Sequence, residues 1–248
     1  ATFQVRAGGG FFTHDHFVGV NYVGIEKMDV TSGSAGDNLL TVDGDDTIHA
    51  GAGDDSFNTA KGKATVDGGA GKDLWGADFS DQTKAVVLDI SKAGTQSFIG
   101  GSETGIEHLS FITGSGDDRI TTLSGTAGAG LNDTVLAGGG DDIVAIGGGT
   151  DTVDGGAGTD TLVIDYATDT FQVRAGGGFF TDDHFNSLTY AGIEKMDVTS
   201  GSAADSLLTV DGDDTIHSGA GNDSFSTAKG NGIVDGGAGD DLWVADFS

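Results

Sequence analysis

The sequence contains no cysteine and no proline, and it has few basic residues. Without cysteine, the chain has neither disulfides nor thiolate metal ligands. Only 11 Lys and Arg stand against 39 Asp and Glu, which gives a formal net charge of -28. Nucleic acid is therefore a poor partner, because binding phosphates requires a basic surface. No apolar run approaches the roughly 20 residues of a membrane span, and the N-terminal residues lack a signal-peptide pattern.

The composition is dominated instead by glycine and aspartate. There are 46 Gly, and only four of the acidic residues are Glu, namely Glu26, Glu103, Glu107 and Glu194. Glycine increases the entropy lost on folding, and the acidic charges repel one another. A chain that is 36% hydrophobic does not offset these costs with a thick apolar core. It is therefore either disordered or completed by a bound cation.

A long repeat divides the chain. Residues 2–80 recur as residues 170–248 with 63 of 79 positions identical, and a divergent stretch lies between the copies. The segment GIEHLSFITG from Gly105 echoes GIEKMDVTSG, which begins at Gly24 and again at Gly192. We read the chain as part of a longer array with three units. They are unit A (1–80; connector 1–31, short repeats 32–76), unit B (81–169; connector 81–112, short repeats 113–163) and unit A′ (170–248; connector 170–199, short repeats 200–244).

A shorter repeat of nine residues, here called a row, lies inside each unit. Every ninth residue is apolar, which fits neither a coiled-coil seam nor one face of a long helix. In unit B, the row of Ile120 is displaced by six extra residues near 122–127. The apolar series are Leu39, Ile48, Phe57, Val66 and Trp75; Ile120, Val135, Val144, Val153 and Leu162; and Leu207, Ile216, Phe225, Val234 and Trp243.

An aspartate usually precedes the apolar residue by two positions, so that the row reads Gly-Gly-x-Gly-x-Asp-x-apolar-x. GGAGKDLWG from Gly68, GGAGTDTLV from Gly155 and GGAGDDLWV from Gly236 match every fixed position. The aspartates at position six are Asp37, Asp46, Asp55, Asp73, Asp118, Asp133, Asp142, Asp151, Asp160, Asp205, Asp214, Asp223 and Asp241.

This pattern resembles the nonapeptide repeat of the RTX (repeat-in-toxin) family. The resemblance implies a calcium-binding parallel β-roll. It also implies a secreted, extracellular or cell-surface protein of a Gram-negative bacterium, exported by a one-step (type I) route and folded outside the cell.

The residue types give the same interpretation on physical grounds. Six residues form a turn and three form a short strand, whose middle side chain faces inward. Two rows then complete a coil of 18 residues, and stacked coils form two narrow parallel sheets around a thin core. We therefore predict an all-β fold, a parallel β-roll or β-solenoid with glycine-aspartate turns and connector segments that bind no calcium.

The stacked turns are predicted to bind calcium, because carbonyl and carboxylate oxygens are the ligands that Ca²⁺ prefers. Each ion is expected between a row and the second row after it, so the aspartate pairs named next give at least about seven sites. The predicted pairs are Asp37–Asp55, Asp55–Asp73, Asp118–Asp142, Asp142–Asp160, Asp133–Asp151, Asp205–Asp223 and Asp223–Asp241. The predicted carbonyl ligands belong to Gly51, Gly53, Gly69, Gly71, Gly138, Gly140, Gly147, Gly149, Gly156, Gly158, Gly219, Gly221, Gly237 and Gly239.

Several positions leave alternatives open. The partners of Asp46 and Asp214 are Ala64 and Gly232, so these two edges are either empty or use Asp43 and Asp211. Position five of the row, such as Asp54, is expected to face solvent. The glutamate of the GIE segments (Glu26, Glu107, Glu194) either caps backbone N–H groups or binds the first ion of its block. The GIE segments are expected to continue the core, with Ile25, Met28 and Val30 packed inside.

Two other features have simple interpretations. His14 and His16 form an HxH pair, but the second copy has Asp182 in place of His14, so surface polarity is preferred to a transition-metal site. Trp75 and Trp243 belong to the apolar series, so core packing is preferred to sugar stacking.

No catalytic motif is present, so we expect no enzymatic activity. The expected function is a calcium-binding structural segment that folds on Ca²⁺ binding outside the cell, either extending a protein or assembling with copies of itself into a fibre or surface layer. The alternative is the folding and secretion module of an exoenzyme or toxin. A carbohydrate- or ice-binding face ranks last, because the outward positions are mixed.

Overall fold

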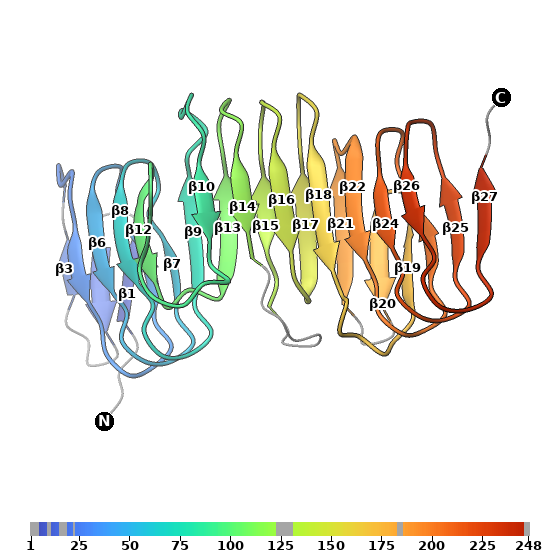
Figure 1. Ribbon diagram of the computed structural model, residues 1–248. Coiled ribbons are helices and arrows are strands. Elements are labelled where there is room, and N and C mark those ends of the chain that lie inside the picture. The colour runs from blue at the N-terminus through green and yellow to red at the C-terminus, as the bar shows by residue number, and fades with distance from the viewer. Residues whose placement is uncertain are drawn as a thin grey trace.

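The structure, a computed structural model, describes residues 5–8, 11–14, 19–21, 23–122, 131–182 and 186–245, with side chains from residue 23 onward. The described residues contain no helix, and short strands follow one another along the chain. They stack into an elongated solenoid with β3 and β27 at opposite ends (Figure 1). The predicted all-β, mainly parallel solenoid is confirmed.

One long sheet of 15 described strands runs through the whole stack. Neighbouring strands are parallel except at two hairpin-like insertions, β1–β2–β3 and β19–β20–β21. In order across the sheet, the strands are β27 (Leu242–Ala245), β25 (Ser224–Thr227), β23 (Ser206–Leu208), β19 (Val173–Gly176), β20 (Phe179–Asp182), β21 (Ser187–Ala191), β17 (Thr150–Asp154), β15 (Thr134–Leu136), β13 (His108–Ile112), β9 (Leu74–Asp78), β7 (Ser56–Asn58), β5 (Asn38–Leu40), β1 (Val5–Gly8), β2 (Phe11–His14) and β3 (Gly19–Asn21).

Two shorter sheets receive the alternate rows. Successive rows of the chain therefore pass from the long sheet to one of the short sheets and back. The seven-stranded sheet contains β10 (Val87–Asp89), β14 (Arg119–Thr121), β16 (Ile143–Ile146), β18 (Thr161–Asp165), β22 (Lys195–Thr199), β24 (Thr215–His217) and β26 (Ile233–Asp235). The five-stranded sheet contains β11 (Gln96–Phe98), β12 (Gly101–Thr104), β8 (Ala64–Asp67), β6 (Asp46–His49) and β4 (Asp29–Thr31).

The pairing register confirms the coil length predicted from the nine-residue rows. Leu39 pairs with Phe57, 18 residues later. In unit B the step grows to 24 residues, as in the pairing of Ile120 with Val144. The difference equals the six extra residues that displace the Ile120 row. Most of these extra residues fall in the segment 123–130, which lies outside the described residues.

The inward apolar residues form one continuous core along the stack. Phe57 is 2% exposed and Trp75 is fully buried. The Trp75 ring packs edge-on against Phe111, with ring centroids 5.0 Å apart, and against Phe79 at 6.3 Å. Core packing, not a sugar platform, is therefore the role of this tryptophan.

Two residues predicted to be in the core are exposed instead. Trp243 is 55% exposed, because β27 is the edge strand of the long sheet and no described strand packs beyond it. Ile25 is 45% exposed, whereas its counterparts Ile106 and Ile193 are buried beneath preceding rows. Core position thus depends on a following or preceding row and not on the sequence motif alone.

The connectors keep the core phase, as predicted. Val30 in β4 pairs with Ile48, and Phe111 in β13 pairs with Val135. Met28, two residues before Val30, is partly buried and packs against the core. Of the predicted HxH pair, the His14 side chain and residue 16 lie outside the part whose side chains are described.

Candidate metal sites

Most position-six aspartates are deeply buried, which is unusual for charged groups. They lie at the point where each turn leads into its strand, so the turn sets the backbone conformation and the strand sets the direction of the side chain. Twelve of the thirteen are buried, from Asp73 at 0% to Asp133, Asp151 and Asp214 at 3% exposed. Asp241, in the last row, is exposed. Burial of a carboxylate is costly unless a partner compensates its charge.

In every one of these aspartates that follows Asp37 in the sequence, one carboxylate oxygen accepts a backbone N–H of the preceding stacked turn; Asp37 Oδ2 accepts the Gly33 N–H of its own turn at 3.3 Å. The Asp37 backbone N–H donates to Asp55 Oδ1 at 2.6 Å, and the Asp55 N–H donates to Asp73 Oδ1 at 2.9 Å. The same contact joins the Asp118 N–H to Asp142 Oδ1 at 2.6 Å. It also joins each of the other predicted pairs: Asp142–Asp160, Asp133–Asp151, Asp205–Asp223 and Asp223–Asp241.

The second carboxylate oxygen is left without a donor in most of these residues. Such an oxygen, buried among backbone carbonyls, is an acceptor that no protein group within the described residues satisfies. A hard divalent cation fits this donor set, because it takes only oxygen ligands. The aspartates whose Oδ2 is buried and receives no hydrogen bond are Asp46, Asp55, Asp73, Asp118, Asp142, Asp160, Asp205 and Asp223.

The pKa values of these carboxyls also show that burial opposes their negative charge. Burial, assisted by neighbouring carboxylates, raises the pKa of Asp142 to about 7 and that of Asp73 to about 6. Burial also raises the pKa of Asp151 to about 7, with repulsion from Asp133 added. The metal-free turns therefore disfavour the ionised form, and a bound cation would reverse this preference.

Glycine is required in the turns because the stacked backbones approach closely. Gly69 has φ +96°, and a Cβ on it would lie 2.0 Å from the Gly51 carbonyl oxygen. Gly71 has φ +152°, and a Cβ there would lie 1.9 Å from the Gly53 oxygen. Only a residue without Cβ permits these carbonyls to crowd together.

The predicted carbonyl ligands differ in the hydrogen bonds that they already accept. The Gly51 oxygen also accepts a hydrogen bond from the Ala70 N–H at 3.0 Å, which leaves one lone pair. In the Asp151 turn, the Gly149 oxygen accepts from the Ser187 N–H at 2.7 Å, and the Gly147 oxygen accepts from the Tyr166 hydroxyl at 3.2 Å. The turn of Asp151 therefore offers less free carbonyl oxygen than the turns of the complete rows.

Asp43 and Asp211 do not substitute for the missing aspartates at Ala64 and Gly232. Asp43 is exposed, and its Oδ1 accepts the Lys61 N–H at 3.2 Å on the outside of the turn. Asp211 binds the Lys229 N–H in the same way at 3.1 Å.

The sequence interpretation missed an outer ladder at position five. Asp54 is exposed, as predicted, but its Oδ1 accepts the Lys72 N–H of the next stacked turn at 2.9 Å. The same contact joins Asp141 to Thr159 and Asn222 to Asp240. The recurrence of Asp or Asn at position five was the available signal, because both side chains offer the acceptor.

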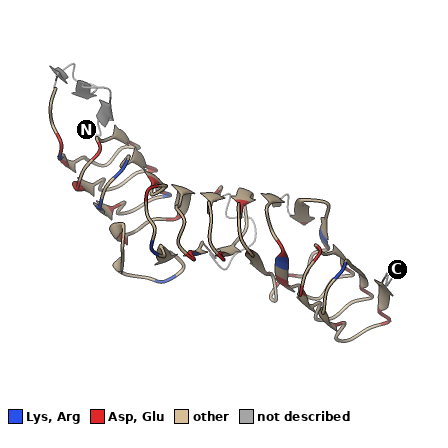
Figure 2. Cartoon of the chain, turned by 90° about the horizontal axis from the view of Figure 1, so that it is seen from above, with Lys and Arg blue, Asp and Glu red and all other residues tan. Residues whose placement is uncertain are grey.

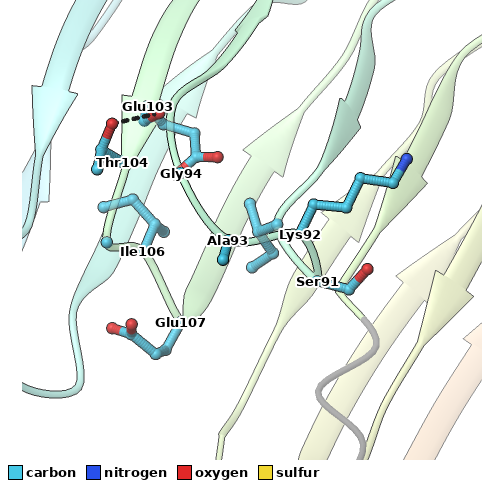
Figure 3. A pocket seen from close by; sticks show the side chains of 10 residues that line it. Ser91, Lys92, Ala93, Gly94, Glu103, Thr104, Ile106 and Glu107 are labelled. Atoms are coloured by element: carbon cyan, nitrogen blue, oxygen red, sulfur yellow. Dashed lines mark hydrogen bonds between the residues drawn. The ribbon is translucent and has the colours of Figure 1, made fainter.

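A cavity of about 390 Å³ lies beside the connector of unit B. Glu103, Ile106 and Glu107 lie along one wall, and Ser91, Lys92 and Ala93 lie along the other (Figure 3). Glu103 is 2% exposed, and burial, with Glu107 nearby, raises its pKa to about 7.

Among the described residues, no three Asp, Glu, His or Cys side chains gather into a metal cluster. The candidate sites are therefore built from paired carboxylates and backbone carbonyls.

The acidic residues recur along the whole stack and follow its turns, with basic residues few and scattered (Figure 2). A parallel solenoid of glycine turns with one buried carboxylate each defines a calcium-binding β-roll. The RTX calcium-binding nonapeptide repeat matches residues 31–66, 41–74, 127–162, 199–234 and 208–242, which together make up half of the chain. The chain belongs to this family, whose repeats bind Ca²⁺ and are typical of secreted bacterial proteins. No curated protein matches the chain. No helix within the described residues is long and apolar enough to cross a membrane.

Proposed function

We propose that this chain is a calcium-dependent structural element that folds outside the cell and extends or assembles a larger surface structure. The observation that carries the proposal is the ladder of buried Asp Oδ2 atoms that receive no hydrogen bond, which recurs in all three units. The three-unit division (1–80, 81–169, 170–248) supports it, because near-identical units are the usual way in which long solenoids grow.

The mechanism we propose is folding coupled to metal binding. Calcium, when bound, supplies the positive charge that the chain lacks; about seven ions would halve the net charge of -28. The glycine turns direct carbonyls inward, and each position-six carboxylate both holds the preceding turn through Oδ1 and offers Oδ2 to the ion. The strands then pair in the register that the turns set. At low calcium, the same carboxylates repel one another.

Calcium titration followed by far-UV circular dichroism tests this function, with Mg²⁺ as the control ion. We expect β structure to form cooperatively near the 10⁻⁴–10⁻³ M range typical of extracellular calcium modules. Asp142→Asn retains an oxygen for the Asp118 N–H but loses the charge, so its midpoint should rise roughly tenfold, as for one lost charge-assisted contact. Asp54→Asn is the matched control, because unit A′ has Asn222 at this position. Full β structure in excess chelator would contradict the proposal.

The near-identical units favour the assembling role over an exoenzyme folding module, because long arrays grow by duplication of such units.

Light scattering with added calcium separates the two roles. Growth into filaments whose rate depends on protein concentration supports assembly. A monomer that remains stable in millimolar calcium supports the folding-module role.

A further inference from the structure

The ladder of carboxylates continues past the last aspartate of a block. The Asp73 backbone N–H donates to Glu107 Oε2 at 2.9 Å, and the Asp160 N–H donates to Glu194 Oε2 at 2.9 Å. The sequence separation is 34 residues in both cases. Each glutamate comes from the GIE turn of the following unit and occupies the place that the next aspartate has inside a block. It lies at the end of the preceding block, not at the first ion of its own.

The backbones of the two turns are joined in the same way at both junctions. The Gly68 N–H donates to the Thr104 oxygen at 2.9 Å, and the Glu107 N–H donates to the Asp73 oxygen at 3.2 Å. The corresponding bonds at the second junction are those from the Gly155 N–H to the Ala191 oxygen at 3.0 Å and from the Glu194 N–H to the Asp160 oxygen at 3.1 Å. The short GIE turn is thus stacked on the complete GGxGxD turn as a further layer.

Carbonyl and carboxylate oxygens converge at these junctions. A Cβ on Gly68 would lie 2.1 Å from the Gly105 carbonyl oxygen and 2.7 Å from Asp73 Oδ2. A Cβ on Gly155 would lie 2.0 Å from the Gly192 oxygen and 2.7 Å from the Oδ2 atom of the Asp160 side chain. This contact explains the Gly at these two positions, whereas Ala50 and Ala137 begin the rows stacked two rows earlier on the same edge.

The aspartate at each junction has an unsatisfied oxygen directed into this space. Asp73 is fully buried and Asp160 is 1% exposed, and neither Oδ2 receives a hydrogen bond. A second carboxylate therefore faces a buried one, which is unfavourable unless a cation lies between them. At the first junction, Lys92 lines the cavity, and its Nζ lies 2.7 Å from Asp89 Oδ2. The Glu107 carboxylate is turned away from Lys92 (Figure 3).

We propose that each unit junction is a further calcium site, formed by Asp73 with Glu107 and by Asp160 with Glu194. The carbonyls of Gly105 and Gly192 complete the oxygen set. This inference rests on the proposed function, but both glutamates lie outside the residues that the nonapeptide repeat matches. Calcium at these sites would fix one unit to the next, so the units fold together and not independently.

The competing explanation is that each glutamate is only a hydrogen-bond acceptor for the aspartate N–H. Substitution by glutamine separates the two, because the glutamine oxygen still accepts the bond while the charge is lost. If the glutamate only caps the N–H, the protein tolerates the change and is stabilised, because the repulsion between glutamate and aspartate is lost. A calcium ligand loses affinity.

The experiment counts bound calcium by equilibrium dialysis and metal analysis for the wild-type chain, E107Q, E194Q and the double variant. Each single variant should lose one ion and the double variant two, with a higher calcium midpoint by circular dichroism. E26Q is the matched control: Glu26 is in the same GIE sequence, is exposed, and has no described turn stacked before it. An unchanged ion count and midpoint in the double variant would overturn the junction sites while leaving the proposed function intact. A wild-type chain that binds no calcium would overturn the proposed function itself.

Amide hydrogen exchange keeps the test decisive if the double variant does not fold. In calcium, E107Q should lose protection at the Asp73 amide and keep it at Asp160, and E194Q should do the reverse. Equal loss at both junctions in either single variant would contradict two separate sites.

Discussion

At the scale of single residues, the turn depends on two residue types with different tasks. The position-six aspartate is buried with one oxygen bonded to the backbone, and the second oxygen is available to a cation. The glycines allow the turns to approach until a carbonyl occupies the space of a missing side chain. The aspartate therefore supplies the charge, and the glycine supplies the space for it.

Gly69→Ala should be strongly destabilising. Gly69 has φ +96°, and a Cβ would lie 2.0 Å from the Gly51 oxygen, so the turn must shift. We expect a loss of about 2–4 kcal/mol, the range for backbone strain combined with a steric clash. The measurement is urea unfolding in saturating calcium.

Gly33→Ala is the control for this variant. Gly33 is in the same kind of turn, but it has no positive φ, and a Cβ there would meet nothing within 4 Å. A comparable loss in both variants would show that glycine entropy, and not the close approach, determines the effect.

At the scale of elements, the aspartates of one edge act as a connected ladder. Asp142 lies between Asp118 and Asp160. Its Oδ1 accepts the Asp118 N–H, its own N–H donates to Asp160 Oδ1, and its pKa is raised to about 7. Asp73, with a pKa of about 6, is linked to Asp55 in the same way. Protonation of such a ladder removes the repulsion that calcium otherwise neutralises.

Acid should therefore promote folding of the calcium-free chain. The raised pKa values mean that the folded state holds protons that the unfolded state, with its ordinary value of 3.8, has released. This contribution to stability is fully present below the ordinary pKa of 3.8, decreases as the pH rises, and is lost above the folded pKa values of about 6 and about 7. In excess chelator, β structure measured by circular dichroism should be greater near pH 5 than near pH 7.5. The lower value stays above the pI of about 4.1.

Salt provides the control for this pH effect. About 1 M NaCl at pH 7.5 screens repulsion between exposed charges without protonating the buried ladder. If salt alone restores the same β structure, general charge repulsion is the cause. If neither condition changes the spectrum, the ladder does not govern folding.

The two tryptophans test how far one row stabilises the next. Trp75 is fully buried between β7 and β13, whereas Trp243 is 55% exposed in β27, although the surrounding sequences are nearly identical. Trp75→Ala should cost about 3–5 kcal/mol, and Trp243→Ala should cost much less. Urea unfolding in calcium measures both. Equal losses would show that Trp243 is covered in solution.

At the scale of the whole molecule, the nine-residue period was sufficient to predict the architecture. Leu39, Ile48 and Phe57 gave the coil length, and the shifted Ile120 row gave the 24-residue step. The exposure of Ile25 and Trp243 was not predictable, because it depends on neighbouring rows that a periodic motif does not specify. The junction contact of Glu107 with Asp73 spans 34 residues. No local spacing encodes such a contact.

The overall dimensions lead to the last prediction, which concerns compaction by calcium. An unfolded chain of 248 residues has a radius of gyration of about 55 Å by the usual scaling. The long sheet of 15 strands, spaced about 4.8 Å apart, is a rod of about 70 Å, for which we expect a radius of gyration of about 20–25 Å. Small-angle X-ray scattering should show this decrease as calcium is added, and magnesium should not reproduce it, because Mg²⁺ keeps its waters in an oxygen cage of this kind. Because the ladder passes through the unit junctions, the decrease should occur in one transition. Separate steps for the three units would show that the junctions do not couple them, and a rod of full length in chelator would show that the glycine turns stack without the ion.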